Sequence, residues 1–171
     1  MAVKETMAFL GDSGRINPEL MRKLARKGYR LLFFSEDVRR MEKLSQELDL
    51  EDEQADVEMV ECAKEGCWEA DIIAFVEPAE IGAGLIKKVR EVSTQKILLC
   101  IETTENPGGG FSGDQLERLQ KDFPFSKVVY LKVDTQARNV QVQGEKSEAE
   151  ETITRIFETS GFEVTPIAIN Q

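Results

Sequence analysis

Histidine is absent from the 171 residues of this chain. Its absence excludes Ser/His and Cys/His nucleophile pairs, zinc sites that use histidine, and the usual general base near neutral pH. Cysteine is scarce too: Cys62, Cys67 and Cys100 are an odd number, and none forms a Cys-x-x-Cys pair with metal-ligand spacing. We therefore expect no metal site, and a reduced, cytoplasmic protein in which Cys100 is a core residue and Cys67 and Trp68 pack against the sheet.

Basic charge and long apolar runs are also lacking. Lysine and arginine total 22 against 32 acidic residues, a net charge of −10, which disfavours a nucleic-acid partner. No stretch approaches the roughly 18 apolar residues of a membrane helix. The N-terminus lacks the basic-then-apolar order of a signal peptide. The sequence predicts a soluble, unprocessed protein that binds neither nucleic acid nor membrane.

Short apolar runs alternate with segments of helical period along nearly the whole chain. This alternation is typical of βαβ units and a mostly parallel sheet. It predicts about eight strands and five helices, with a short helical or irregular segment at 63–70. No linker or repeat divides residues 1–171, so we expect one doubly wound α/β domain. The predicted strands are 7–10, 31–34, 57–60, 72–76, 97–101, 127–131, 140–143 and 162–169.

The first strand-to-helix turn is the commonest phosphate site of such a sheet. Here the spacing Gly11-x-x-Gly14 allows the backbone to approach a pyrophosphate, with Arg15 as an added cation. Only one glycine of a Gly-x-Gly-x-x-Gly fingerprint survives when that motif is centred on Gly14. Asn17 and Pro18 also read as a helix cap followed by a first-turn proline. The turn is thus consistent with phosphate binding or with a purely structural role.

The end of the second strand should select the cofactor. Ser35 is not acidic, and Arg39 or Arg40 follows in the next helical turn, which favours the extra phosphate of NADP. Glu36 and Asp37 oppose that choice because they repel a phosphate. The alternative is that Ser35 and Arg39 are only a helix cap and a surface charge.

Several pieces, in order, resemble the dinucleotide-binding domain of coenzyme F420-dependent NADP oxidoreductases, which is related to the cytoplasmic domain of the STEAP metalloreductases. The matching pieces are Phe9-Leu10-Gly11 with Gly14, Phe33-Phe34-Ser35, residues 69–73 leading to Pro78, residues 140–144 and residues 160–164. The resemblance covers nearly the whole chain. It departs from the family pattern at Asn17, where the third glycine would stand, and at Glu36, where an arginine usually follows the serine.

The resemblance implies a Rossmann-like, three-layer α/β/α fold. It also implies an NADP-dependent oxidoreductase that passes hydride to a flavin or to a deazaflavin such as F420. The cofactors carry that chemistry, so no catalytic acid or base is assigned. The residues implied for cofactor binding are Gly11, Ser13, Gly14, Arg15 and Ile16 at the pyrophosphate, Ser35 and Arg39 at the adenosine ribose, and Val76, Glu77 and Pro78 beside the adenine or nicotinamide half.

The competing prediction is a non-catalytic module. In it the fingerprint has decayed, and the domain serves as a nucleotide sensor or as a dimerising scaffold whose partner is a second copy of the chain. Asp12, Asn17 and Glu36 favour this alternative because each replaces a group that would assist phosphate binding.

Overall fold

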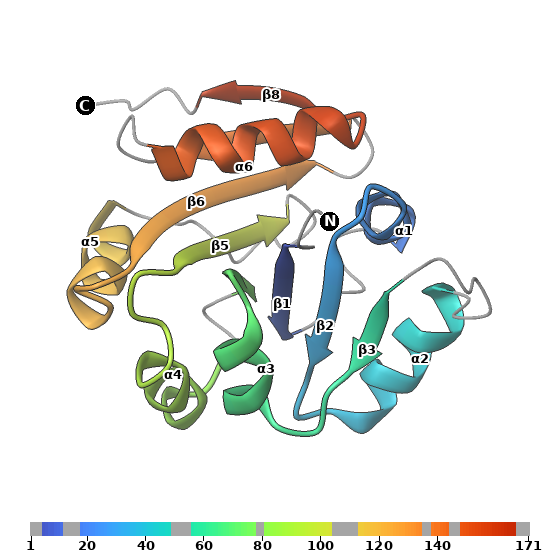
Figure 1. The fold of residues 1–171 in the computed structure, drawn as a ribbon. Helices are drawn as coiled ribbons and strands as arrows, with labels where there is room; N and C mark the ends of the chain where they lie inside the picture. The colour runs from blue at the N-terminus through green and yellow to red at the C-terminus, as the bar shows by residue number, and fades with distance from the viewer. Residues whose placement is uncertain are drawn as a thin grey trace.

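The structure is a computed structural model that describes residues 5–11, 18–48, 56–77, 81–103, 113–134, 138–143 and 148–166. Within these ranges, eight strands form one sheet in the order β3-β2-β1-β4-β5-β6-β7-β8 (Figure 1). β7 is antiparallel to β6, and all other neighbouring pairs are parallel. The strands are β1 (Thr6–Gly11), β2 (Arg30–Phe34), β3 (Val57–Met59), β4 (Ile72–Val76), β5 (Ile97–Thr103), β6 (Lys127–Asp134), β7 (Asn139–Gln143) and β8 (Glu163–Pro166).

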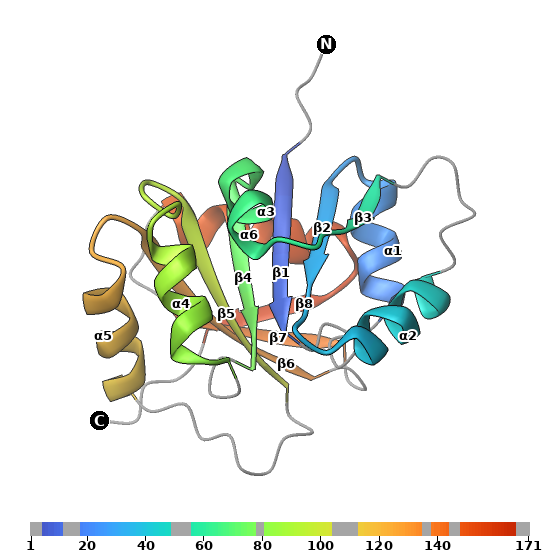
Figure 2. The same cartoon turned by 90° about the horizontal axis from the view of Figure 1, so that it is seen from below.

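Helices cover both faces of this sheet. α6 lies behind the strands and α3 and α4 lie in front of them in Figure 2. One core joins the sheet to α1, α2 and α6, and a second joins its other face to α3, α4 and α5. The helices are α1 (Pro18–Arg26), α2 (Val38–Leu48), α3 (Ala63–Glu69), α4 (Ala83–Arg90), α5 (Gly113–Asp122) and α6 (Glu148–Thr159).

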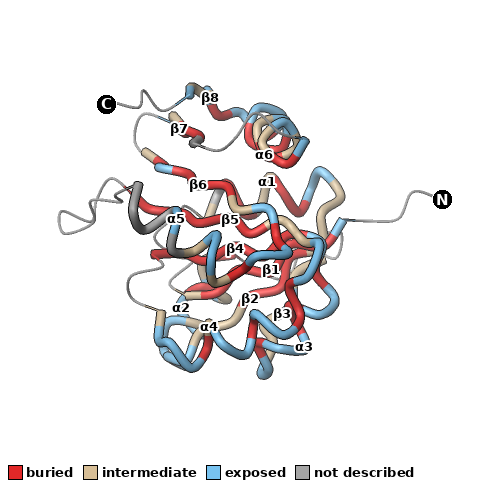
Figure 3. Tube along the Cα trace, turned by 90° about the vertical axis from the view of Figure 1, so that its left-hand side faces the viewer, coloured by how far each residue is buried: buried red, intermediate tan, exposed pale blue. Residues whose placement is uncertain are grey.

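Continuous apolar strands place the core between the layers. All five residues of β4 are buried, as expected of a central strand that both helical layers cover (Figure 3). β7, one strand from the edge, alternates instead, with Val140 and Val142 buried and Gln141 exposed. The order 3-2-1-4-5-6 of the first six strands is that of a doubly wound Rossmann-like sheet, which confirms the predicted fold class.

The structure corrects the number of helices. Residues 63–69 form α3, so six helices rather than five lie in the described ranges. Ala63, Gly66 and Cys67 face the sheet at spacings of three and four residues. Seven residues are too few for this periodicity to stand out in a sequence.

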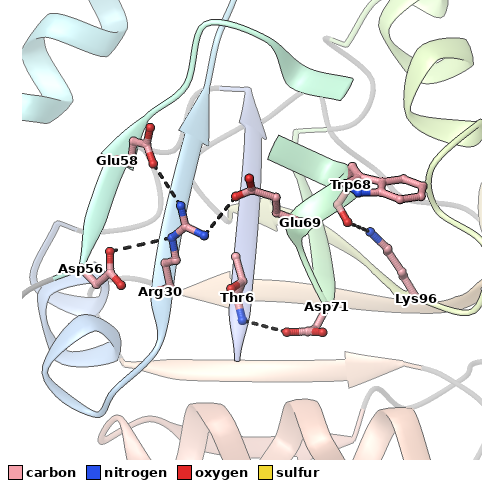
Figure 4. Close-up of polar contacts among 8 residues, drawn as sticks. All are labelled: Thr6, Arg30, Asp56, Glu58, Trp68, Glu69, Asp71 and Lys96. Atoms are coloured by element: carbon pink, nitrogen blue, oxygen red, sulfur yellow. Dashed lines mark hydrogen bonds and ion pairs between the residues drawn. The ribbon is translucent and has the colours of Figure 1, made fainter. Parts of the chain in front are cut away.

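The structure also corrects the prediction that Trp68 packs against the sheet. Its side chain is 72% exposed, because it follows the buried Cys67 by one residue and so lies about 100° around the helix. Lys96 donates to the carbonyl oxygen of Trp68 at 2.6 Å and lies 6.0 Å from the indole ring centre (Figure 4). Cys67 and Cys100 are buried as predicted.

Polar contacts join the amino ends of the strands near Trp68. Arg30 forms ion pairs with Asp56, Glu58 and Glu69 at 3.9, 3.2 and 3.0 Å, and the Thr6 N–H donates to Asp71 at 2.9 Å (Figure 4). The three carboxylates are 41–57% exposed and Arg30 is 33% exposed, so each ion pair adds no more than about 1 kcal/mol. They hold the strand starts in register at the edge opposite the strand ends described next.

Candidate functional site

The order of the strands creates a switch point between β1 and β4. The chain leaves β1 towards β2 on one side and returns through β4 on the other, so their carboxyl ends border a crevice. Gly11, the last residue of β1, pairs with Val76, the last residue of β4. Ligands of open α/β sheets bind in this position.

Gly11 is the residue on which the crevice depends. Its φ is +105°, and an added Cβ would lie 2.6 Å from the carbonyl oxygen of Val76. No residue with a side chain fits there without moving backbone. The glycine therefore lets the end of β1 lie directly against the end of β4.

A cavity of about 270 Å³ occupies this position. This volume lies near the lower end of the range of roughly 300–1,000 Å³ for small-molecule sites. Three of the predicted site residues, Gly11, Ser35 and Val76, line it together. Among the described residues, the others that line it are Glu36, Asp37, Arg40, Ile81, Gly82 and Leu85.

The Ser35–Asp37 segment forms a compact cap at the start of α2. The Asp37 N–H donates to Ser35 Oγ at 3.1 Å, and the Arg39 N–H donates to Asp37 Oδ1 at 3.0 Å. Asp37 is therefore the N-cap of α2, and its charge is favourable at the positive end of the helix dipole. The alternative interpretation placed the helix cap at Ser35, whereas Ser35 accepts a bond in the turn before the cap and also lines the cavity.

The two arginines of this segment point to different places. Arg39 lies in a shallow hollow with Glu36, Asp37 and Val38, outside the set of residues that line the cavity. Arg40 lines the cavity and forms an ion pair with Asp37 Oδ2 at 3.5 Å. The structure thus brings Arg40, rather than Arg39, together with Ser35.

Glu77 joins the ends of β4 and β5 beneath the crevice. It is 2% exposed, and its φ of +53° turns the chain after Val76. Its Oε1 accepts hydrogen bonds from the N–H of Thr103 at 2.9 Å and from the hydroxyl of Thr103 at 2.7 Å. Glu77, which we predicted to flank the cofactor, therefore acts in this structure as a buried connection between two strand ends.

A second buried carboxylate lies beside it. The hydroxyl of Tyr130 donates to Glu102 Oε2 at 2.6 Å, and both residues are buried. Burial, together with the hydrogen bond to Glu102, raises the pKa of Tyr130 well above its ordinary value of 10. Burial likewise raises the pKa of Cys100, on the adjacent strand, to about 12. Both groups therefore stay neutral in the folded protein at physiological pH.

The raised pKa of Tyr130 predicts a loss of stability in alkali. Above about pH 10 the unfolded tyrosine ionises while the folded one does not, so stability falls as pH rises. We expect the free energy of unfolding of Tyr130→Phe to fall less steeply with pH than that of the unmodified protein, by up to about 1.4 kcal/mol per pH unit. Urea unfolding at several pH values between neutrality and strong alkali measures it. If the free energy of unfolding falls equally steeply with pH in the unmodified protein and in Tyr130→Phe, the raised pKa of Tyr130 is contradicted.

The remaining predicted site residues, Ser13, Gly14, Arg15, Ile16 and Pro78, lie outside the described residues. Sequence reasoning missed that Ile81, Gly82 and Leu85 line the cavity. It also missed the pairing of Glu77 with Thr103. The available signal was that both residues stand at the ends of buried runs, where parallel strands meet at one edge.

The described residues contain no group of three or more His, Cys, Asp or Glu side chains arranged to hold a metal ion. In the same ranges, no helix combines the length and the apolar character that crossing a membrane requires.

No protein-family model matches the chain, and no curated protein matches its sequence. Solved structures match its shape. A candidate F420-dependent NADP reductase from Arthrobacter sp. FB24 has 20% identity and a TM-score of 0.67, over 94% of this chain and 83% of that one. A variant imine reductase from Myxococcus stipitatus, in complex with NAD+, has 14% identity and a TM-score of 0.68, over 96% of this chain and 55% of that one.

Pyrroline carboxylate reductase from Plasmodium falciparum, with NADP bound, has 15% identity and a TM-score of 0.66, over 96% of this chain and 58% of that one. This chain thus spans little more than half the length of the pyrroline carboxylate and imine reductases. At these identities the likeness establishes the fold. The chain has the Rossmann-like α/β fold found in NAD(P)-dependent reductases.

Proposed function

We propose that this chain binds a nicotinamide dinucleotide and serves as the cofactor domain of an oxidoreductase. The observation that carries the proposal is the cavity at the β1–β4 switch point, which Gly11 and Val76 line together. Solved structures of the same fold that hold NAD+ or NADP support it.

Each described part of the cavity suits a part of such a ligand. Gly11 lines the cavity without a side chain, which suits the close backbone approach that a pyrophosphate needs. Ile81 and Leu85 offer an apolar wall for a flat ring, and polar groups at 35–37 lie at the end of β2, where an adenosine ribose would bind. The chain would hold and orient the dinucleotide, which supplies the hydride.

The finer proposal concerns the partner of that hydride. Sequence resemblance and the similar fold of the Arthrobacter structure support a flavin or a deazaflavin of the F420 type as the acceptor, with NADP as the dinucleotide in that family. A bound dinucleotide that is not oxidised in the presence of either acceptor would instead support the non-catalytic sensor or scaffold. Stopped-flow measurements of nicotinamide absorbance with each acceptor distinguish the oxidoreductase from the non-catalytic module.

Binding is the first quantity to measure. We expect calorimetry to show saturable binding of NADH, NADPH or both, and a ligand at about 100 times its Kd should stabilise the fold by roughly 2.7 kcal/mol. The fluorescence of the reduced nicotinamide is the better optical signal. Trp68 is unsuitable, because it is 72% exposed at the opposite edge of the sheet.

A pair of glycine variants tests whether the cavity is the binding site. Gly82 and Gly84 are both exposed, and a Cβ added at either meets no atom within 4 Å, so a side chain has space at both positions. Only Gly82 lines the cavity. We expect Gly82→Leu to weaken binding about tenfold or more and Gly84→Leu to leave it unchanged. Equal affinities in the two variants would remove this cavity from the proposal.

A further inference from the structure

The cavity carries more negative than positive charge at the end of β2. Of its described lining residues, Glu36 and Asp37 are acidic and Arg40 is basic, so their formal charges sum to −1. These three residues come from the same segment, directly after Phe34, the last residue of β2. In a dinucleotide-binding sheet this segment faces the adenosine ribose.

The basic residue is already engaged. Arg40 Nε forms an ion pair with Asp37 Oδ2 at 3.5 Å, and Asp37 Oδ1 is held by the N–H of Arg39. Any anion that recruits Arg40 must therefore compete with a carboxylate that the start of α2 holds in place. Arg39, its neighbour in the described part of the chain, lies outside the residues that line the cavity.

Glu36 is in the opposite situation. It is exposed, lines the cavity, and takes part in no hydrogen bond or ion pair among the described residues. A carboxylate accepts hydrogen bonds and cannot donate them when ionised. Its natural partners are hydroxyl groups, such as the 2′ and 3′ hydroxyls of a ribose.

NAD and NADP differ only at the 2′ position of this ribose, which carries a hydroxyl in NAD and a phosphate of charge about −1.5 to −2 in NADP. We infer that the pocket selects NAD(H) against NADP(H), because Glu36 accepts a hydrogen bond from the 2′ hydroxyl and repels a 2′ phosphate. This inference rests on the proposed dinucleotide function. It replaces the preference for NADP that Ser35 and Arg39 indicated in the sequence.

The test compares the Kd values of NADH and NADPH for the full chain by calorimetry. We expect NADH to bind about tenfold or more tightly, and Glu36→Gln, which removes the charge and keeps the size, to reduce that ratio about tenfold. Glu42→Gln is the matched control, because Glu42 is exposed on α2, the helix that follows Glu36, but does not line the cavity. It should leave the ratio unchanged.

Ionic strength provides a second readout. Repulsion between Glu36 and a 2′ phosphate acts through solvent, so salt should weaken it. Raising the salt concentration from about 0.1 M to 1 M shortens the Debye length from about 10 Å to 3 Å. The Kd values of NADH and NADPH should therefore become more similar. A difference in affinity that arose from the shape of the cavity alone would not change with salt concentration. A salt-independent preference would therefore overturn the role of Glu36.

The outcomes separate the two proposals. Equal affinities, or tighter binding of NADPH by the unmodified chain, overturn the selectivity and leave dinucleotide binding standing. Binding of neither nucleotide overturns the proposed function and the selectivity with it. A preference for NADH that Glu36→Gln and Glu42→Gln both leave intact shows that Glu36 does not carry it.

Discussion

Gly11→Ala is expected to lower the free energy of unfolding by about 3 kcal/mol and to weaken dinucleotide binding at least tenfold. Two effects add. The φ of +105° is unfavourable for alanine by about 1–2 kcal/mol, and the new Cβ would stand 2.6 Å from the carbonyl oxygen of Val76. Since that neighbour is backbone, β1 or β4 must move, and the crevice between them changes shape. Urea unfolding and calorimetry with NADH measure the two losses.

Gly28 provides the matched control for Gly11. Its φ is +97°, but an added Cβ meets nothing within 4 Å. Gly28→Ala should therefore cost only the backbone term of about 1–2 kcal/mol and leave binding unchanged. If the two variants lose equal free energy of unfolding, the close approach of Gly11 to Val76 does not affect stability, and only the positive φ of Gly11 requires a glycine.

Glu77→Ala is expected to destabilise the protein by about 3 kcal/mol, which lowers the Tm by roughly 6–12 °C in a chain of this length. The substitution leaves the N–H and the hydroxyl of Thr103 without the acceptor that both now share. A buried donor without a partner costs about 1–3 kcal/mol. Because Glu77 and Thr103 are both almost fully buried, water cannot replace the lost oxygen without opening the strand ends.

Glu77→Gln distinguishes the hydrogen bonds from the charge. Its amide oxygen can accept the same two bonds, so only the difference between a charged and a neutral acceptor is lost, about 1 kcal/mol. Scanning calorimetry of both variants gives the comparison. A glutamine variant as unstable as the alanine variant would show that charge, and not the pairing with Thr103, stabilises this end of the sheet.

The fold was predictable because its signals repeat. β1, β2, β4 and β5 are runs of mostly apolar residues, and each is followed by a helix, so the short strand β3 does not hide the pattern. α3 was the exception, since seven residues show too little of the helical period. Trp68 was misplaced for a related reason. A shift of one residue turns a helical side chain by about 100°, from the sheet to solvent, and only the observed helix sets that angle.

The site was predictable in place but not in detail. Gly11, Ser35 and Val76 stand at strand ends, and parallel strands carry all such ends to one edge, so their meeting followed from the fold. The difference between Arg39 and Arg40 did not follow. It depends on where Asp37 caps α2, because the cap sets the phase of the helix and directs one arginine to the cavity and the other away from it.

The sequence by itself determined the doubly wound α/β fold, the edge of the sheet where we propose that a ligand binds, and the absence of histidine chemistry. Local periodicity and composition are sufficient for these properties. Only the tertiary structure decided that Gly11 lies against Val76, that Glu77 pairs with Thr103 across 26 residues, and that Glu36 faces the cavity with Arg40 already paired. These contacts depend on distances between segments far apart in the chain, and their energies arise only after the strands have come together.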